Sequence, residues 1–138
     1  MTAKEYLEQV KIKTIKIKRI QHKLDALLLL SQNCTAKITD MPKNPSPPRS
    51  SLEQVVLMTI DTQAELEKEQ HELDELICEI GMMITSIKDR HCVDILLKRY
   101  IEMKPFEDIA DELKYSYRWV LKLHGKGLME ITKRLNGD

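Results

Sequence analysis

Apolar residues recur at alternating spacings of three and four along two long stretches of the chain, as in helices that pack along one seam. In the first stretch the repeated positions are Leu7, Val10, Thr14, Ile17, Gln21, Leu24 and Leu28. In the second they are Leu52, Val56, Thr59, Gln63, Leu66, Gln70, Leu73, Ile77, Ile80, Ile84 and Ile87. Such a stripe is stable only when it faces another helix. The pattern predicts a long antiparallel, coiled-coil-like helical hairpin over residues 1–87.

Capping signals mark where these helices should begin. Thr2 with Glu5, and Ser51 with Gln54, have the spacing of a capping box. Residues 31–50 lack periodicity and concentrate Pro, Ser and Asn, which predicts a Pro-rich loop between the helices.

Charge and polar positions favour pairing of these two helices. Residues 1–23 carry seven basic and two acidic residues, net +5, whereas residues 51–87 carry one basic and nine acidic residues, net −8. If residues whose numbers add to 84 face one another, Gln21 meets Gln63 and Thr14 meets Gln70. We expect these polar layers to set the register, because a mispaired buried amide loses hydrogen bonds.

Two apolar residues fall off the first stripe. Ile12 and Ile15 either have partly covered side chains or form a second contact face for a partner subunit. The second alternative would make the hairpin a site of homodimerisation.

The remaining residues, 88–138, predict a three-helix unit. A leader helix should begin near Asp89, and Pro105 suits the first position of a short helix with Phe106, Ile109, Ala110 and Leu113 inward. Ser116 is a good N-cap for a second helix, with Val120, Leu123, Gly127 and Leu128 inward. Two short helices, a tight turn and a basic outer face form the helix-turn-helix pattern.

Backbone conformation is a further consideration at the turn between the two short helices and at two glycines in the second of them. Lys114 occupies the turn position where Gly or Asn often accommodates a positive φ. Gly125 and Gly127 each cost about 1 kcal/mol of helix propensity. Close packing against the other helices is the better explanation for Gly127.

Four features of residues 90–131 stand out: LLKRY before the motif, the DIA tripeptide, the spacing from Ser116 to Val120, and the ending Gly125-Lys126-Gly127-Leu128. In these features the segment resembles region four of bacterial sigma factors, the part that recognises promoter DNA. The whole chain is similar to small late transcription regulators of phages, the RinA/ArpU group. This resemblance implies a DNA-binding domain over residues 88–138, with a recognition helix at 116–134.

The N-terminal part of such a recognition helix enters the major groove. By helix geometry Tyr117, Arg118, Leu121 and Lys122 project from that part, and the resemblance implies base or backbone contacts for the same four. Arg118 is the best candidate for a bidentate bond to guanine, and Lys122 could bind guanine or phosphate. The predicted phosphate ligands are Lys126, Lys114 and Lys104. Trp119 replaces a residue that is usually basic in sigma factors, so we expect it to pack on the preceding helix.

Catalysis has little support in the sequence. The three cysteines and four histidines have no pairing or metal-ligand spacing, and no Gly-rich phosphate loop occurs. We therefore expect a non-enzyme without metal or cofactor. No signal peptide is evident and the longest apolar run, Ala26–Leu30, is too short to span a membrane. A reduced, cytoplasmic setting in a bacterial or phage-infected cell is expected.

Three functions fit these features. The first is a transcription regulator that binds specific double-stranded DNA, with the hairpin supplying dimerisation or a contact to RNA polymerase. The second is a DNA-packaging protein like a phage small terminase subunit, in which hairpins build a ring. The third uses the same fold for a protein contact alone. A ring of eight or more subunits would favour packaging, and a monomer or dimer would favour regulation.

Overall fold

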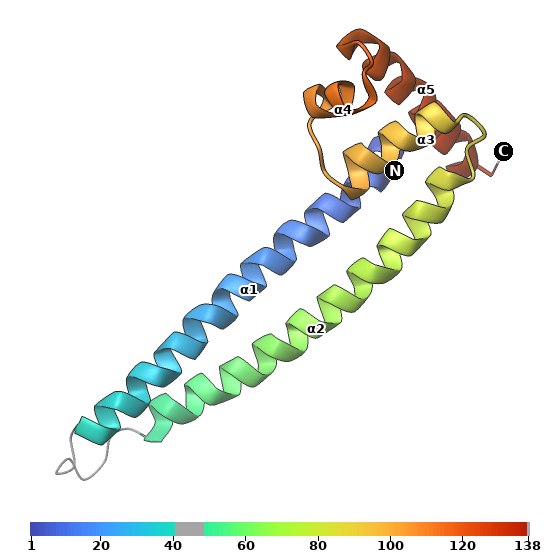
Figure 1. Ribbon diagram of the computed structural model, residues 1–138. Coiled ribbons are helices and arrows are strands. Elements are labelled where there is room, and N and C mark those ends of the chain that lie inside the picture. The colour runs from blue at the N-terminus through green and yellow to red at the C-terminus, as the bar shows by residue number, and fades with distance from the viewer. Residues whose placement is uncertain (41–48, 138) are drawn as a thin grey trace. The chain divides into compact units, whose positions relative to one another are not determined.

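The computed structural model describes the backbone of residues 1–40 and 49–137, and the side chains of 1–33 and 51–137. This part of the chain is all-α. Its elements are α1 (Ala3–Asp40), α2 (Arg49–Thr85), α3 (Arg90–Leu96), the π-helical η1 (Leu97–Ile101), α4 (Phe106–Leu113) and α5 (Tyr117–Leu135). Helices α1 and α2 are long and pack antiparallel, and three shorter α-helices follow (Figure 1). The predicted helical hairpin is confirmed.

The chain forms two compact units. One contains Met1–Thr14 and Leu73–Asp138, and the other contains Ile15–Glu72. The predicted domain boundary between residues 87 and 88 lies inside the first unit. The reason is a shared core, since Leu7 of α1 and Ile84 of α2 belong to the same buried cluster as Ile95 of α3 and Val120 of α5.

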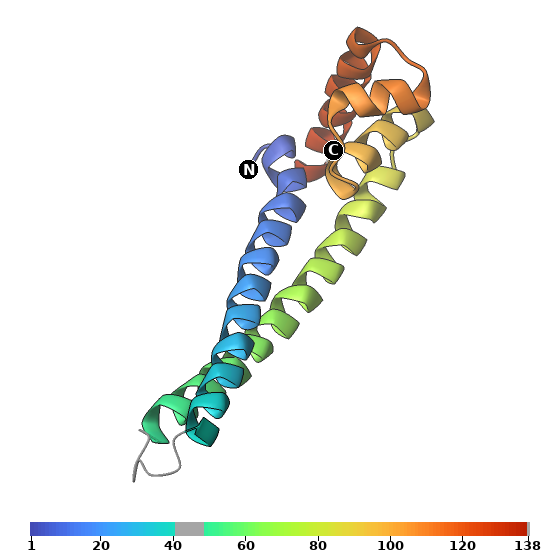
Figure 2. The same cartoon turned by 60° about the vertical axis from the view of Figure 1, so that its left-hand side comes forward.

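Two contacts define the register of the hairpin, which the two views in Figures 1 and 2 show as helices side by side. In the first unit the Tyr6 hydroxyl donates to Glu79 Oε1 at 3.1 Å. In the second unit Lys16 Nζ lies 3.0 Å from Glu69 Oε1. Both pairs of residue numbers add to 85, so the observed register is one residue from the predicted one.

The buried seam differs from the predicted stripe at alternate positions. Ile20 and Leu27 are buried where Gln21 and Leu28 were expected, and Leu28 is 47% exposed. On α2 the seam contains Val55, Thr62 and Glu69 in place of Val56, Gln63 and Gln70. A shift of one residue rotates a side chain by about 100° around the helix, and the first helix thereby buries isoleucine instead of glutamine.

The predicted polar layers are therefore wrong within one chain. Gln21, Gln63 and Gln70 are all exposed. Thr14 donates its hydroxyl to the carbonyl oxygen of Val10 at 2.8 Å, so it needs no partner on α2. Ile12 is 65% exposed and Ile15 is 39% exposed, so the chain leaves much of both side chains uncovered.

One predicted capping box is confirmed and the other is wrong. The Glu5 amide donates to Thr2 Oγ1, and the Thr2 amide donates to Glu5 Oε2, both at 3.2 Å. Helix α2 begins at Arg49, so Ser51 lies within it and cannot cap its start.

The predicted loop at 31–50 is too long, because α1 continues to Asp40. Residues 41–48 lie outside the described part of the chain. Residues 31–40 contain no Gly or Pro, and their polar residues cost a helix only about 0.5 kcal/mol each. Polarity alone was thus a poor signal for the helix end.

The shorter helices begin where the sequence predicts, within one residue. Asp89 is the N-cap of α3 and accepts from the His91 amide at 3.0 Å. Pro105 is the N-cap of α4 rather than its first residue. Gly127 of α5 lies against α3, where a Cβ atom would be 2.8 Å from Leu96 Cδ1. The close packing predicted for Gly127 is confirmed.

Candidate nucleic-acid interface

Helix α4 ends in a left-handed turn that sets the direction of α5. Lys114 has φ 58° and ψ 39°, and the Tyr115 amide bonds back to the Ala110 carbonyl oxygen at 3.0 Å. Such a residue normally is Gly, because a Cβ atom crowds the backbone at positive φ. Ile109 and Ala110 are buried beneath this turn, as predicted.

Ser116 opens α5 as its N-cap. Its Oγ accepts from the Trp119 amide at 3.1 Å. The other amides at the start of a helix have no partner inside the helix. Val120, Leu123, Gly127 and Ile131 form the buried side of the helix. Leu128, predicted to be inward, is half-buried and packs against the same core.

The four residues predicted to contact DNA share the opposite side of α5. Tyr117 is 47% and Leu121 is 40% exposed, and Arg118 and Lys122 are exposed as well. Among the described residues neither cation has an ion-pair partner, whereas the phenol ring and the leucine side chain offer apolar contact area. We call this surface, made by Tyr117, Arg118, Leu121 and Lys122, the outer face of α5.

Trp119 lies beside Lys122 on α5. Its side chain is 43% exposed, so it is outside the buried core, and Lys122 Nζ lies 5.6 Å from the centroid of its ring. A cation over an indole ring is a weak attraction at an exposed site. Packing of Trp119 on the preceding helix stays a prediction.

Lys126, a predicted phosphate ligand, is exposed but already engaged by the chain. Its Nζ lies 3.0 Å from Asp89 Oδ2. The hydrogen bond with Asp89 raises the pKa of Lys126, and the same bond lowers the pKa of Asp89. One carboxylate thus caps α3 and neutralises a cation of α5, a combination that the sequence did not suggest.

Lys104 is similarly engaged. Its Nζ lies 2.6 Å from Glu112 Oε1 and 3.2 Å from Glu102 Oε1. These hydrogen bonds raise the pKa of Lys104, that with Glu112 being the stronger influence. Glu112 is also paired with Lys98 at 3.1 Å. Of the three predicted phosphate ligands, Lys114 is the one for which the described residues supply no ion pair.

Aromatic residues beneath α5 hold its middle in place. The Tyr100 hydroxyl and His124 Nε2 are 2.7 Å apart, and the Phe106 ring meets the His124 ring edge-on at 4.9 Å between centroids. Burial, with Arg99 and Lys4 nearby, lowers the pKa of His124 to about 4. His124 is thus a neutral packing residue at physiological pH.

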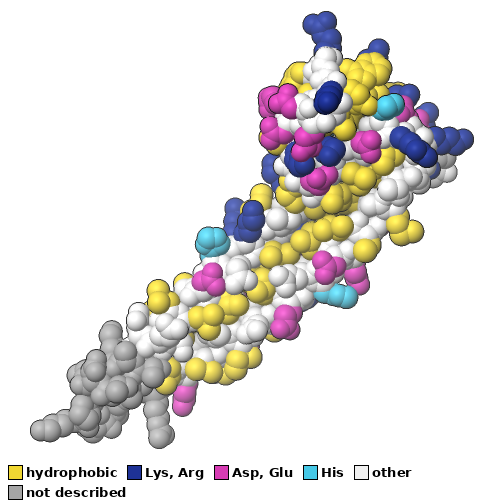
Figure 3. Space-filling model, in the orientation of Figure 1, with side chains coloured by type: hydrophobic (Ala, Val, Ile, Leu, Met, Phe, Trp, Pro, Cys, Tyr) yellow, Lys and Arg dark blue, Asp and Glu magenta, His cyan; other side chains and the backbone are white. Residues whose placement is uncertain are grey.

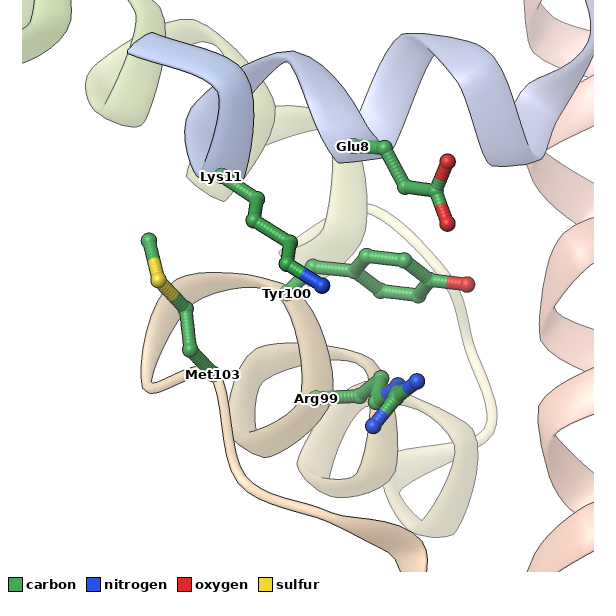
Figure 4. A pocket seen from close by; sticks show the side chains of 5 residues that line it. All are labelled: Glu8, Lys11, Arg99, Tyr100 and Met103. Carbon is green, nitrogen blue, oxygen red and sulfur yellow. The ribbon is translucent and has the colours of Figure 1, made fainter. Parts of the chain in front are cut away.

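A small hollow lies on another part of the same unit (Figure 4). Glu8 and Lys11 of α1 border it on one side, and Arg99, Tyr100 and Met103 border it on the other. Burial raises the pKa of Tyr100 to about 12, so its phenol stays protonated. The hollow contains none of the residues predicted to contact DNA.

Comparison with known proteins gave no match among family models, curated proteins or solved structures. Within the described residues, no group of three or more His, Cys, Asp or Glu side chains is arranged to hold a metal ion. None of the described helices has a stretch apolar enough and long enough to cross a membrane.

Proposed function

We propose that the chain binds double-stranded DNA through the outer face of α5 and acts as a sequence-specific transcription regulator of phage or mobile-element type. The observation that carries this proposal is the exposure of Arg118 and Lys122 beside the N-terminus of a helix whose other side is buried. A helix that presents two cations, and whose first-turn amides lack partners inside the helix, suits a negatively charged groove.

The apolar members of this face support base recognition. The ring of Tyr and the side chain of Leu are apolar, and such groups can contact a thymine methyl group in the major groove. Tyr117 and Leu121 stand on the same side as the two cations. Figure 3 likewise shows Lys and Arg side chains beside hydrophobic ones over the shorter helices. We assign specificity to Arg118, Tyr117 and Leu121, and largely nonspecific attraction to Lys114.

Selection of bound duplexes from a random DNA pool tests the proposal. We expect a defined sequence to be enriched, and Arg118→Ala to weaken its binding by about 1–3 kcal/mol while relaxing preference at one position. Lys122→Ala should weaken binding and make the salt dependence shallower by about one phosphate contact, a slope change near 0.9.

Lys133→Ala, a change of the same kind near the end of α5, is the matched control and should leave specific binding unchanged. Equal binding by wild type, Arg118→Ala and Lys122→Ala would reject the outer face as the DNA contact. A ring of eight or more subunits in solution would instead favour the packaging function.

A further inference from the structure

The second unit contains residues that belong to the repeated three- and four-residue pattern of the sequence but lie outside the buried seam between α1 and α2. These are the five residues Gln21, Leu28, Val56, Gln63 and Gln70, all exposed. Leu28 is 47% and Val56 is 43% exposed, high values for aliphatic residues in a continuous heptad pattern. We call this set the flank.

All five residues of the flank lie on one side of the hairpin. Each directly follows a residue of the observed seam, so each is rotated by about 100° from the seam in the direction of the chain. The two helices run in opposite directions and face each other. The same rotation therefore carries the flank residues of both helices to the same side.

The flank is also ordered along its length. In the register set by Lys16 and Glu69, Leu28 lies level with Val56 to within a residue, and Gln21 lies level with Gln63. Lys18 and Glu67 are exposed and lie farther round the helices, about 160° and 140° from the seam residues Ile20 and Thr62, so they are at the edge of this side. An aliphatic level and an amide level thus follow one another, with a charged pair at the edge.

We propose that a second copy of this chain covers the flank, with its hairpin alongside and a twofold axis parallel to the helices. In this arrangement α1 of each copy lies against α2 of the other, antiparallel. The axis leaves every level unchanged, so Leu28 meets the partner's Val56 and Gln21 meets the partner's Gln63, with Lys18 and the partner's Glu67 at the edge of the contact. A surface that matches itself in this way is what an isologous dimer requires.

Charge selects this partner and this orientation. The first helix is basic and the second acidic, so contact of α1 with the partner's α1, or of α2 with the partner's α2, opposes like charges. Contact of α1 with the partner's α2 opposes unlike charges. The layer of Gln21 and Gln63, which one chain does not form, is then formed between two chains. This explains why the sequence repeats positions that a single hairpin leaves exposed to water.

The size of the contact predicts a weak dimer. A stretch of about sixteen residues is about 24 Å long, and two helices about 10 Å wide give a footprint on the order of 500 Å² per copy. Stable complexes usually bury about 800 Å² per partner. We therefore expect a dissociation constant in the micromolar range, and the inference does not depend on DNA binding.

Sedimentation equilibrium of the full chain from 1 to 100 μM tests the dimer. We expect a monomer–dimer equilibrium that Leu28→Glu or Val56→Glu weakens at least tenfold. Leu30→Glu is the matched control, because Leu30 is 48% exposed, nearly as much as Leu28, but lies about 200° away around the same helix. Wild type that stays monomeric at 100 μM, or equal weakening by Leu30→Glu, would overturn the proposal.

Cross-linking tests the orientation. Chains carrying Leu28→Cys are mixed with chains carrying Val56→Cys, both with Cys34→Ser and Cys78→Ser so that only buried Cys92 remains. We expect a disulfide between the two kinds of chain. Cross-links confined to pairs of Leu28→Cys chains would reject the parallel axis. Helix content by circular dichroism confirms that each variant folds.

Discussion

At the scale of single residues, two glycines of α5 allow the effect of packing on stability to be distinguished from the effect of helix propensity. A Cβ atom on Gly127 would lie 2.8 Å from Leu96 Cδ1 and 3.2 Å from Leu96 Cγ, whereas a Cβ atom on Gly125 would meet nothing within 4 Å. We expect Gly125→Ala to stabilise the fold by about 0.5–1 kcal/mol. Gly127→Ala should destabilise it by about 1 kcal/mol, because crowding of the buried Leu96 outweighs the gain in propensity.

Urea unfolding of the two variants measures this difference, and each glycine serves as the control for the other. Stabilisation of both variants would mean that Leu96 moves aside without cost. The sequence suggested close packing at Gly127, because this residue shares the inward side of the helix with Val120 and Leu123. It held no signal for how close Leu96 comes, because that distance depends on where α3 crosses α5.

His124 gives the fold a dependence on pH. Its pKa is about 4 in the folded chain and 6.5 ordinarily, so the unfolded chain binds a proton between these values and the folded chain does not. Stability contributed by neutral His124 is complete above pH 6.5 and is lost as the pH falls towards 4, by no more than about 3 kcal/mol.

The free energy of unfolding measured by urea between pH 7 and 4.5 checks this dependence. His124→Gln keeps a polar group near Tyr100 but cannot titrate, so its profile should be flatter than that of wild type over this range. Parallel profiles would show that His124 is not the group responsible, and that ordinary carboxylates account for any loss.

At the scale of helices, the sequence predicted type and pairing well but register poorly. The caps at Thr2, Asp89 and Ser116 follow from local chemistry within a single helix. The hairpin follows from the two long apolar stripes. The seam does not, because apolar residues are continuous enough to allow either of two overlapping stripes. Within one chain the stripe of Ile20 and Leu27 is buried, because both residues are apolar. The alternative stripe would bury the polar Gln21 together with Leu28.

The candidate interface shows the same division. The exposed side of α5 was predictable, since Val120 and Leu123 determine which way the helix turns. The engagement of Lys104 and Lys126 was not, because Glu112 and Asp89 reach them only once separate helices come together. Charge counted along the sequence therefore overstated the number of unpaired cations at the proposed interface.

At the scale of the whole molecule, we expect those ion pairs to moderate the proposed attraction to DNA. Asp89→Asn keeps a side chain that can cap α3, since Asn is as good an N-cap as Asp, but it removes the charge that holds Lys126. We expect this variant to bind nonspecific duplex more tightly, with a salt dependence steeper by up to about one phosphate contact. Fluorescence anisotropy of a random duplex between 50 and 200 mM salt measures both effects. Asp25→Asn, a matched loss of charge on α1, controls for net charge: an equal effect of both variants would show that Lys126 contributes no local contact, and that overall charge alone controls binding.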